Sequence, residues 1–191
     1  MDINQRIAGR VRAARDAAGL SLAALAERSG VSRSNISLIE RGESSATATV
    51  LDKLSAALGI TVAALFEAPP GAMPSPLARA ADQPAWTDPG SGYLRRNLSP
   101  AAWSPIQLVE VSFPPGARVA YDTSARAVDV DQQVWIIEGA MEVTVGATRW
   151  QLAAGDCLAM RLDRPIAFHN PGPTAARYLV ALTTQTHQPP K

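Results

Sequence analysis

Residues 22–42 read LAALAERSGVSRSNISLIERG, and this stretch decides the fold of the N-terminal part of the chain. Two short runs with the apolar spacing of helices flank a turn that contains Gly30 and Val31. Ser21 and Ser32 stand where a side-chain oxygen caps the first turn of each helix. The spacing predicts a helix-turn-helix, a geometry in which the second helix enters the major groove of DNA.

The second predicted helix begins with short or hydrogen-bonding side chains. A major groove about 12 Å wide admits one helix if its exposed face carries such groups. The candidate DNA-contacting residues on this face are Ser32, Arg33, Ser34, Asn35 and Ser37. We expect Arg33 to pair with guanine O6 and N7, and Asn35 with adenine N6 and N7. Arg41 lies beyond the groove and suits a phosphate contact, whereas Glu40 is expected to brace the helix.

Three more predicted helices bring the N-terminal part to five. Apolar residues at Ile3, Ile7 and Val11 form the stripe of an amphipathic first helix. A fourth helix is predicted to end at Gly59, and Thr61 to cap a short fifth one. The alternative interpretation is a small helical bundle that does not bind DNA, because helix pairs joined at a glycine are common.

The order of these helices, the Leu and Ala spacing and the IERG ending belong together in a known pattern. Residues 3–67 resemble the XRE class of helix-turn-helix DNA-binding domains, related to phage lambda-type repressors, and LAERSGVSRSNISLIERGESSATATVLDKLSAALGI follows that pattern nearly throughout. The resemblance implies a five-helix lambda-repressor-like domain that binds a double-stranded DNA operator. Leu22 and Ala46 depart from the pattern, since many relatives carry Gln and Pro there, which weakens the transfer of individual contacts.

The rest of the chain, residues 69–191, holds all 15 prolines and alternates like strands. Strands are predicted at 92–98, 105–113, 117–121, 132–139, 141–146, 148–155, 157–162, 165–170 and 176–184. Such evenly spaced short strands predict an all-β sandwich or barrel. The sequence therefore predicts a multidomain α + β chain. Its parts are a DNA-binding domain at 1–68, a linker at 69–89, a β domain at 90–185 and a tail at 186–191.

The predicted β domain resembles the cupin family over about residues 90–184. The resemblance rests on FPPG, on VWIIEGAMEVTVGATRWQLAAGDCLAM and on RPIAFHNPG. It implies a double-stranded β-helix barrel with a pocket inside, in which many cupins hold a metal through three His and a Glu. Those four positions fall on Asp122, Ser124, Gln132 and Ile166. No imidazole remains among them, and His169 would face away from Ile166 on the same strand, so we expect no metal and no cofactor.

A pocket of this kind suits recognition of a small organic effector. The candidate ligand-binding residues are Asp122, Ser124, Gln132, Val134, Ile136, Met160 and Ile166. Arg95, Arg96 and Arg118 are further candidates for an anionic ligand, although arginines on exposed strands are usually solvated. Cys157 is expected to be a small buried apolar residue and not a nucleophile.

Composition narrows the class of protein. The 191 residues carry 18 Lys and Arg against 17 Asp and Glu, a net charge of +1, which excludes a polycation that binds nucleic acid by bulk charge. One cysteine cannot form an internal disulfide, which fits a reducing cytoplasm. The N-terminal stretch lacks the apolar core of a secretory signal, and no run of about 18 apolar residues occurs. We expect a cytoplasmic protein that does not enter membranes.

The predicted function is a sequence-specific DNA-binding transcriptional regulator whose cupin barrel senses a small-molecule effector without a metal. We do not expect an enzyme. Two alternatives stay open: a metal-dependent cupin dioxygenase or isomerase with an accessory DNA-binding domain, and a cupin used only for dimerisation. A homodimer is expected because two-fold pairing puts two recognition helices one DNA turn, about 34 Å, apart. Trp135 and Trp150 are expected in packing or dimer contacts.

Overall fold

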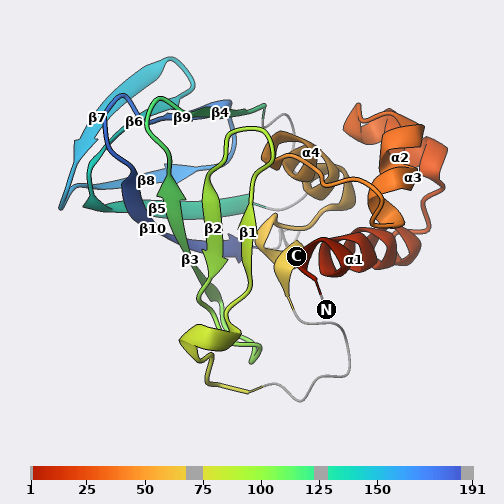
Figure 1. The fold of residues 1–191 in the computed structure, drawn as a ribbon. Helices are drawn as coiled ribbons and strands as arrows, with labels where there is room; N and C mark the ends of the chain where they lie inside the picture. The colour runs from red at the N-terminus through yellow and green to blue at the C-terminus, as the bar shows by residue number, and fades with distance from the viewer. Residues whose placement is uncertain (1, 68–74, 123–128, 186–191) are drawn as a thin grey trace, which may run out of the picture.

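A helical domain and a two-sheet β domain lie side by side in the chain (Figure 1). The structure, a computed structural model, describes residues 2–67, 75–122 and 129–185. The helices are α1 (Ile3–Ala17), α2 (Leu22–Ser29), α3 (Arg33–Glu40), α4 (Ala48–Leu58), and the 3-10 turns η1 (Ala63–Phe66) and η2 (Ala80–Asp82). The architecture of helices first and β barrel second confirms the predicted fold class.

The helices begin and end where local chemistry stops them. The Ser21 hydroxyl accepts a hydrogen bond from the Ala24 N–H at 3.1 Å at the start of α2. Thr47 caps α4 in the same way, with its hydroxyl 3.4 Å from the Val50 nitrogen. Gly59 closes α4 in the left-handed conformation. Because these caps satisfy the free N–H and C=O groups of each helix end, the short helices need little propensity of their own.

The predicted fifth helix is a single 3-10 turn. Thr61 caps it as expected, since its hydroxyl accepts from the Ala64 N–H at 3.1 Å, but η1 has only four residues. Leu65 and Phe66 are both buried. An extended Glu67 ends the turn immediately, shortly before the Pro69-Pro70 pair in the sequence, which cannot continue a helix.

The β domain consists of two antiparallel sheets. The six-stranded sheet has the order β1-β2-β3-β10-β5-β8 and the four-stranded sheet the order β4-β9-β6-β7. The strands are β1 (Ala85–Thr87), β2 (Leu94–Asn97), β3 (Ile106–Phe113), β4 (Arg118–Tyr121), β5 (Asp129–Glu138), β6 (Ala140–Val145), β7 (Thr148–Ala153), β8 (Cys157–Arg161), β9 (Ile166–His169) and β10 (Ala176–Gln185). All nine predicted strands are present, and the two facing sheets form the cupin-like barrel that the sequence resembles.

One strand lies inside the stretch that the sequence suggested as a linker. β1 pairs with β2 through Trp86 opposite Arg95, so the sheet begins at Ala85 and not at residue 90. Trp86 is 3% exposed, with its ring packed between Phe66 and Tyr93. The three-residue strand escaped the sequence analysis because proline and alanine surround it, and such composition is typical of extended linkers.

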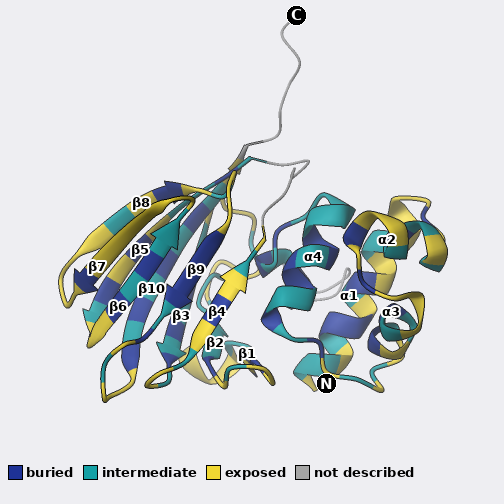
Figure 2. Ribbon diagram, turned by 90° about the horizontal axis from the view of Figure 1, so that it is seen from above, coloured by how far each residue is buried: buried dark blue, intermediate teal, exposed yellow. Residues whose placement is uncertain are grey.

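The barrel core lies between the two sheets. β9 is mostly buried and β10 alternates between buried and half-buried residues, whereas β7 and β8 are mostly exposed (Figure 2). Cys157, expected in the core, is exposed instead, because it lies on the outward phase of β8 opposite the inward-facing Met160. Gly139 has a φ of +77°, and a Cβ there would come 2.9 Å from the Ala176 Cα, so only glycine fits this hairpin corner.

The longest of the described helices, α1, has 15 residues. None of the described helices combines the length and hydropathy that a membrane span requires.

Candidate functional site

The turn between α2 and α3 is fixed by a short chain of hydrogen bonds. Gly30 adopts a left-handed φ of +67° and donates its N–H to the Ala26 carbonyl at 2.9 Å. The Ser29 hydroxyl donates to the Leu25 carbonyl at 2.7 Å and accepts from the Val31 N–H at 3.2 Å. Val31 itself is buried, so the turn is anchored from both backbone and side chain. This anchoring sets the angle at which α3 leaves α2.

The N-terminal face of α3 points away from the core. Ile36 and Ile39 pack inward with exposures of 0% and 2%. Ser32, Arg33 and Ser34 are exposed, and Asn35 and Ser37 are half-buried. The five candidate DNA-contacting residues therefore occupy one helix end opposite the buried stripe. Ser32 also caps α3, because its hydroxyl accepts from the Asn35 N–H at 3.3 Å.

The outer face of α3 also carries an apolar residue that the sequence analysis did not name. Leu38 is 37% exposed and lies outside the stripe made by Ile36 and Ile39. An exposed leucine on a helix that is otherwise polar on this face is suited to contact a thymine methyl group. Its signal in the sequence was the leucine of ISLIE, an apolar residue in addition to the Ile36 and Ile39 of the inward stripe.

A buried ion pair braces α3 against α1. The Arg15 guanidinium donates from Nε and Nη2 to the two Glu40 carboxylate oxygens at 2.7 and 2.9 Å. Their side chains are only 13% and 7% exposed. Arg15 also donates to the Leu20 carbonyl at 2.9 Å, and its hydrogen bonds to Glu40 raise the pKa of the guanidinium. Glu40 thus braces α3 against α1, and both of its carboxylate oxygens are occupied by Arg15.

Arg41, the candidate phosphate contact, is already engaged. Its Nε and Nη2 lie 2.8 and 2.7 Å from the Glu43 carboxylate oxygens, and its Nη1 donates to the Ser37 hydroxyl. The pair lowers the pKa of Glu43 and raises that of Arg41. Both residues are exposed, so the guanidinium is at the surface, but a phosphate would have to share it with Glu43 or displace the carboxylate.

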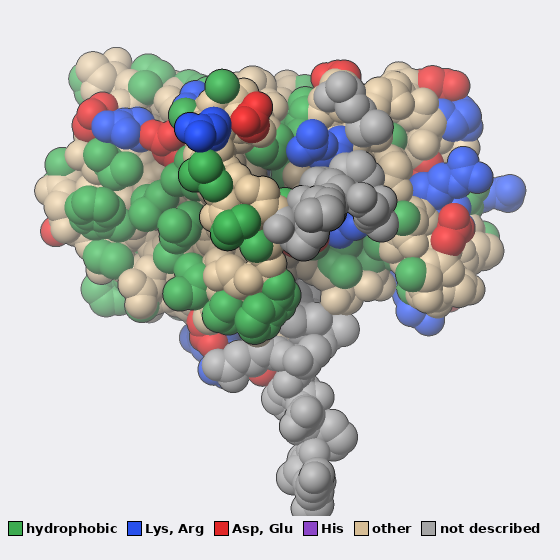
Figure 3. Space-filling model, turned by 90° about the horizontal axis from the view of Figure 1, so that it is seen from below, with side chains coloured by type: hydrophobic (Ala, Val, Ile, Leu, Met, Phe, Trp, Pro, Cys, Tyr) green, Lys and Arg blue, Asp and Glu red, His purple; other side chains and the backbone are tan. Residues whose placement is uncertain are grey.

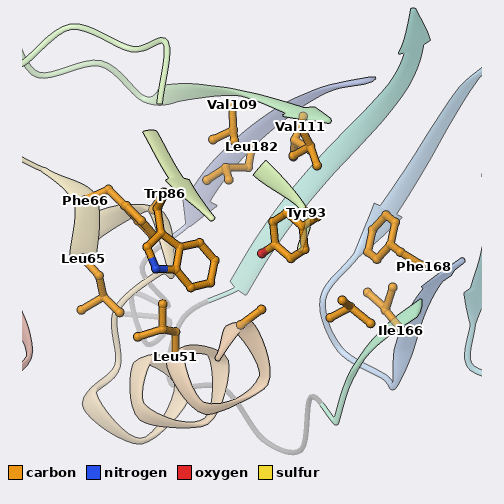
Figure 4. Close-up of a cluster of buried hydrophobic side chains, with 14 of the residues drawn as sticks. Leu51, Leu65, Phe66, Trp86, Tyr93, Val109, Val111, Ile166, Phe168 and Leu182 are labelled. Atoms are coloured by element: carbon orange, nitrogen blue, oxygen red, sulfur yellow. The ribbon is translucent and has the colours of Figure 1, made fainter. Parts of the chain in front are cut away.

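A cavity of about 90 Å³ lies where the helical domain meets the barrel. Its wall includes Thr61 and Ala63 from the helical domain and Tyr93, Tyr121 and Phe168 from the β domain. Figure 4 shows the same arrangement, with Leu51, Leu65 and Phe66 on one side, Ile166 and Phe168 on the other, and Trp86 and Tyr93 between them. The cavity therefore opens at the barrel end that faces α4 and η1.

Two of the seven predicted pocket residues line this cavity, Gln132 and Ile166. Val134, Ile136 and Met160 are buried in the barrel but are not part of the wall, and Asp122 is exposed. Ser124 lies outside the described residues. The prediction assumed a pocket in the middle of the barrel, where large apolar side chains instead fill the space, so the cavity is shifted toward the helical domain.

Arg95 contributes a positively charged side chain to the cavity wall. Its guanidinium lies 5.1 Å from the centre of the Phe66 ring, and its Nε and Nη2 are buried without a hydrogen-bond partner among the described residues. Arg96 and Arg118, the other two candidates for an anionic ligand, are not part of the wall. The sequence favoured a solvated Arg95, because nothing in LRRN shows that a buried tryptophan pairs with it.

Residues 11–65 match the family described as helix-turn-helix, HTH_3. This part of the chain is an XRE-type helix-turn-helix domain. The match covers α2, α3 and α4, the elements whose geometry is given above, and ends within η1. No curated protein matches the chain.

Solved structures resemble the chain beyond the helix-turn-helix domain. An HTH_3 family transcriptional regulator from Vibrio cholerae is 24% identical, covers 96% of this chain and 98% of its own, and superimposes with a TM-score of 0.75, which shows a shared two-domain fold. The Cupin_2 domain of an XRE family transcriptional regulator from Enterobacter cloacae is 19% identical over 51% of this chain and 98% of its own, with a TM-score of 0.42. Hydroxypropylphosphonic acid epoxidase from S. wedmorenis is 18% identical over 94% and 97%, with a TM-score of 0.46. The last two scores are too low to support an argument.

The helix-turn-helix domain is attached to the barrel by polar contacts that the sequence did not reveal. The buried Asp88 carboxylate, which follows β1, accepts from the Ala48 N–H at 2.9 Å and so caps α4 from the other domain. It also accepts from the Ser91 N–H and hydroxyl at 2.9 and 2.6 Å. The Thr49 hydroxyl donates to the Ala120 carbonyl at 3.3 Å. Because α4 also packs on the turn-forming helices, these contacts connect barrel and helix-turn-helix.

The residues at the cupin metal positions do not fit a metal. Gln132 contributes an amide and Ile166 an apolar side chain to the wall, and Asp122 is exposed. His169 lies on the outer face of β9, with its Nδ1 3.8 Å from Glu142. Across residues 2–67, 75–122 and 129–185, no three His, Cys, Asp or Glu side chains converge in a way that could hold a metal ion. First-row transition metals require three or four such ligands.

Proposed function

We propose that the chain is a sequence-specific DNA-binding transcriptional regulator whose barrel senses a small organic effector without a metal. The observation that carries the proposal is the outward face of α3, where an exposed Arg33 and a half-buried Asn35 lie in the first turn of the anchored helix. Guanidinium and amide groups at this place match the donor and acceptor pattern of base edges in the major groove. We expect a regulator of this kind to act in the cytoplasm.

The proposal is tested by selecting duplexes from a random pool with the full chain and measuring retention on a gel. We expect enrichment of one sequence, arranged as two similar half-sites about one helical turn apart. Retention of all duplexes with equal affinity, or of none, would reject sequence-specific binding.

Arg41→Ala is expected to weaken binding to the selected operator and to unrelated duplexes by the same factor. Arg41 lies past the base-reading face of α3, so it can only add a sequence-independent phosphate contact. The slope of log affinity against log salt concentration should fall by about one per removed contact. Fluorescence anisotropy over a salt series measures both effects, and a loss confined to one base position would contradict the assignment.

The proposed role of the barrel is sensing and not catalysis. The described cavity wall offers an amide, an arginine, aromatic rings and one carboxylate, Asp52, which suit recognition, and His169 lies on the outer face of β9. The alternative function is that of a metal-dependent cupin enzyme. Metal analysis of the purified chain distinguishes the two functions, because a stoichiometric metal bound in the barrel would favour the enzyme over the sensor.

We propose a homodimer formed through the outer face of the six-stranded sheet. The outward side chains of its central strands are unusually apolar for a solvent-facing sheet, among them Ile106, Leu108, Trp135, Ile137 and Leu179. Ile106 and Trp135 are 54% and 47% exposed, and hydrophobic side chains gather over the β domain on this side (Figure 3). A second copy is the fitting partner, because operator reading requires two recognition helices.

Sedimentation equilibrium tests this arrangement. We expect twice the 20.1 kDa chain mass for the native chain and a monomer for Trp135→Glu, which places a charge at the centre of the face. Trp150→Glu is the matched control, because Trp150 is equally exposed at 46% but lies on the other sheet. A native monomer, or an unchanged dimer in Trp135→Glu, would reject this surface.

A further inference from the structure

The cavity between the two domains contains a positive charge, that of Arg95, whose buried Nε and Nη2 pair with no carboxylate among the described residues. The pKa of Arg95 is lowered by burial, yet arginine stays charged in proteins. The groups that act on its charge are the hydroxyls of Tyr93, Tyr121 and Tyr178, and the first two lie 3.2 Å from each other. Burial raises the pKa of both phenols, so they remain neutral and supply no counter-charge. Asp52 is the one carboxylate of the described wall and has interactions of its own.

An uncompensated guanidinium in such a place is unfavourable by itself. Buried charges in proteins are normally paired, because removal of the hydration shell costs several kcal/mol. The Phe66 ring at 5.1 Å offers a cation–π contact, which recovers only part of that cost. Nε and Nη2 are buried without a hydrogen-bond partner among the described residues, and this pair of guanidinium donors is the one that binds a carboxylate through two parallel hydrogen bonds.

The other residues of the wall indicate the chemistry that the rest of a ligand should have. Val111, Ile166, Phe168 and Leu182 present apolar surface to the cavity (Figure 4). Gln132 adds a polar group whose only described side-chain contact is a weak one, 3.5 Å to the Met160 sulfur. A cavity of about 90 Å³ has room for a molecule the size of several waters, since one water occupies on the order of 10–15 Å³ by the same measure.

We propose that this cavity binds a small carboxylic acid with an apolar body, whose carboxylate pairs with Arg95 and whose body packs against the barrel wall. That the acid acts as the effector rests on the proposed function; that it binds does not. Thr61, Val62 and Ala63 of the helix-turn-helix domain form part of the same wall, so the ligand contacts both domains at once. A ligand that contacts both shifts their arrangement by the difference in its affinity for each arrangement.

Isothermal titration calorimetry of the full chain tests the binding site. The probes are straight-chain carboxylates of two to six carbons and benzoate, each against its primary amide and its amine, with sulfate as an inorganic anion. We expect at least one carboxylate to bind once per chain and at least tenfold more tightly than its amide and amine. The proposal is overturned if no carboxylate saturates the protein, or if sulfate, an amide or an amine binds as tightly.

Arg95→Met gives the second test. It should lose the preference for carboxylate over amide, and its ligand-free melting temperature should be equal to or above that of the native chain, because methionine fills the site without a buried charge. Arg96→Met is the matched control, since Arg96 is the next residue of β2 and is not part of the wall. Unchanged carboxylate binding by Arg95→Met would overturn the site.

Gel retention of the selected operator, with and without the best carboxylate, keeps this proposal separate from the proposed function. Carboxylate binding without any change in operator affinity would support the site and reject its role as effector site. Operator binding without carboxylate binding would reject the site and leave the DNA-binding function standing.

Discussion

Arg33→Ala is expected to abolish discrimination between the operator and unrelated DNA while leaving the fold unchanged. Arg33 is the first residue of α3 and is exposed at the end of the helix that a major groove admits. A guanidinium that binds guanine O6 and N7 contributes about 1–3 kcal/mol of discrimination, so two copies in a dimer contribute roughly 2–6 kcal/mol. At about 1.4 kcal/mol per factor of ten, operator affinity should fall about 30-fold to 10⁴-fold.

The matched control removes an arginine of the β domain, outside the helical domain that contains α3. Arg149→Ala lies in the β6–β7 hairpin, where its side chain is 67% exposed, and should leave operator affinity within about twofold. Affinity of Arg33→Ala for unrelated duplexes should fall much less than its affinity for the operator. A normal operator footprint by Arg33→Ala would contradict the base contact, whereas equal losses on every duplex would make Arg33 a phosphate contact.

Local signals in the sequence were sufficient for the helix-turn-helix. Gly30, Ser21 and Ser32 fix the ends of two helices by capping chemistry that acts within three or four residues, so a linear pattern records it. The nine predicted strands are present for the same reason, because alternation and turn residues are also local. The short β1, the 3-10 turn η2 and the length of η1 differed, and the packing of Phe66 on Trp86 between the domains contributes to η1 and β1.

The cavity could not be predicted in the same way, because residues far apart in the chain form it. Thr61 and Arg95 lie 34 positions apart in the sequence and face the same space. The cupin resemblance placed Gln132 and Ile166 facing the barrel interior, and both line the cavity wall, since their phase on β5 and β9 follows from the barrel. It said nothing about a neighbouring domain, so it missed the burial of Arg95 and the capping of α4 by Asp88.

Trp86→Ala is expected to produce the largest loss of stability and to separate the unfolding of the two domains. The side chain is 3% exposed, and its ring packs edge-on against Phe66 at 5.8 Å and Tyr93 at 5.9 Å. Truncation of a buried tryptophan costs about 3–5 kcal/mol, because the cavity left behind is only partly refilled. For a chain of this size, that corresponds to a melting temperature lower by about 6–20 °C.

The position of Trp86 makes this variant a test of coupling as well as of stability. Phe66 lies in η1 of the helical domain and Tyr93 in the wall of the cavity, so the ring connects the domain that would bind DNA with the site that would bind the acid. Calorimetry should show one transition for the native chain and for Trp86→Phe, which keeps an aromatic ring in place, and two transitions for Trp86→Ala.

Trp103→Ala should leave the number of transitions and the melting temperature unchanged, since Trp103 is 88% exposed. A single transition in Trp86→Ala, shifted by less than about 2 °C, would mean that the domains are coupled by other contacts, with the Asp88 cap on α4 as the next candidate.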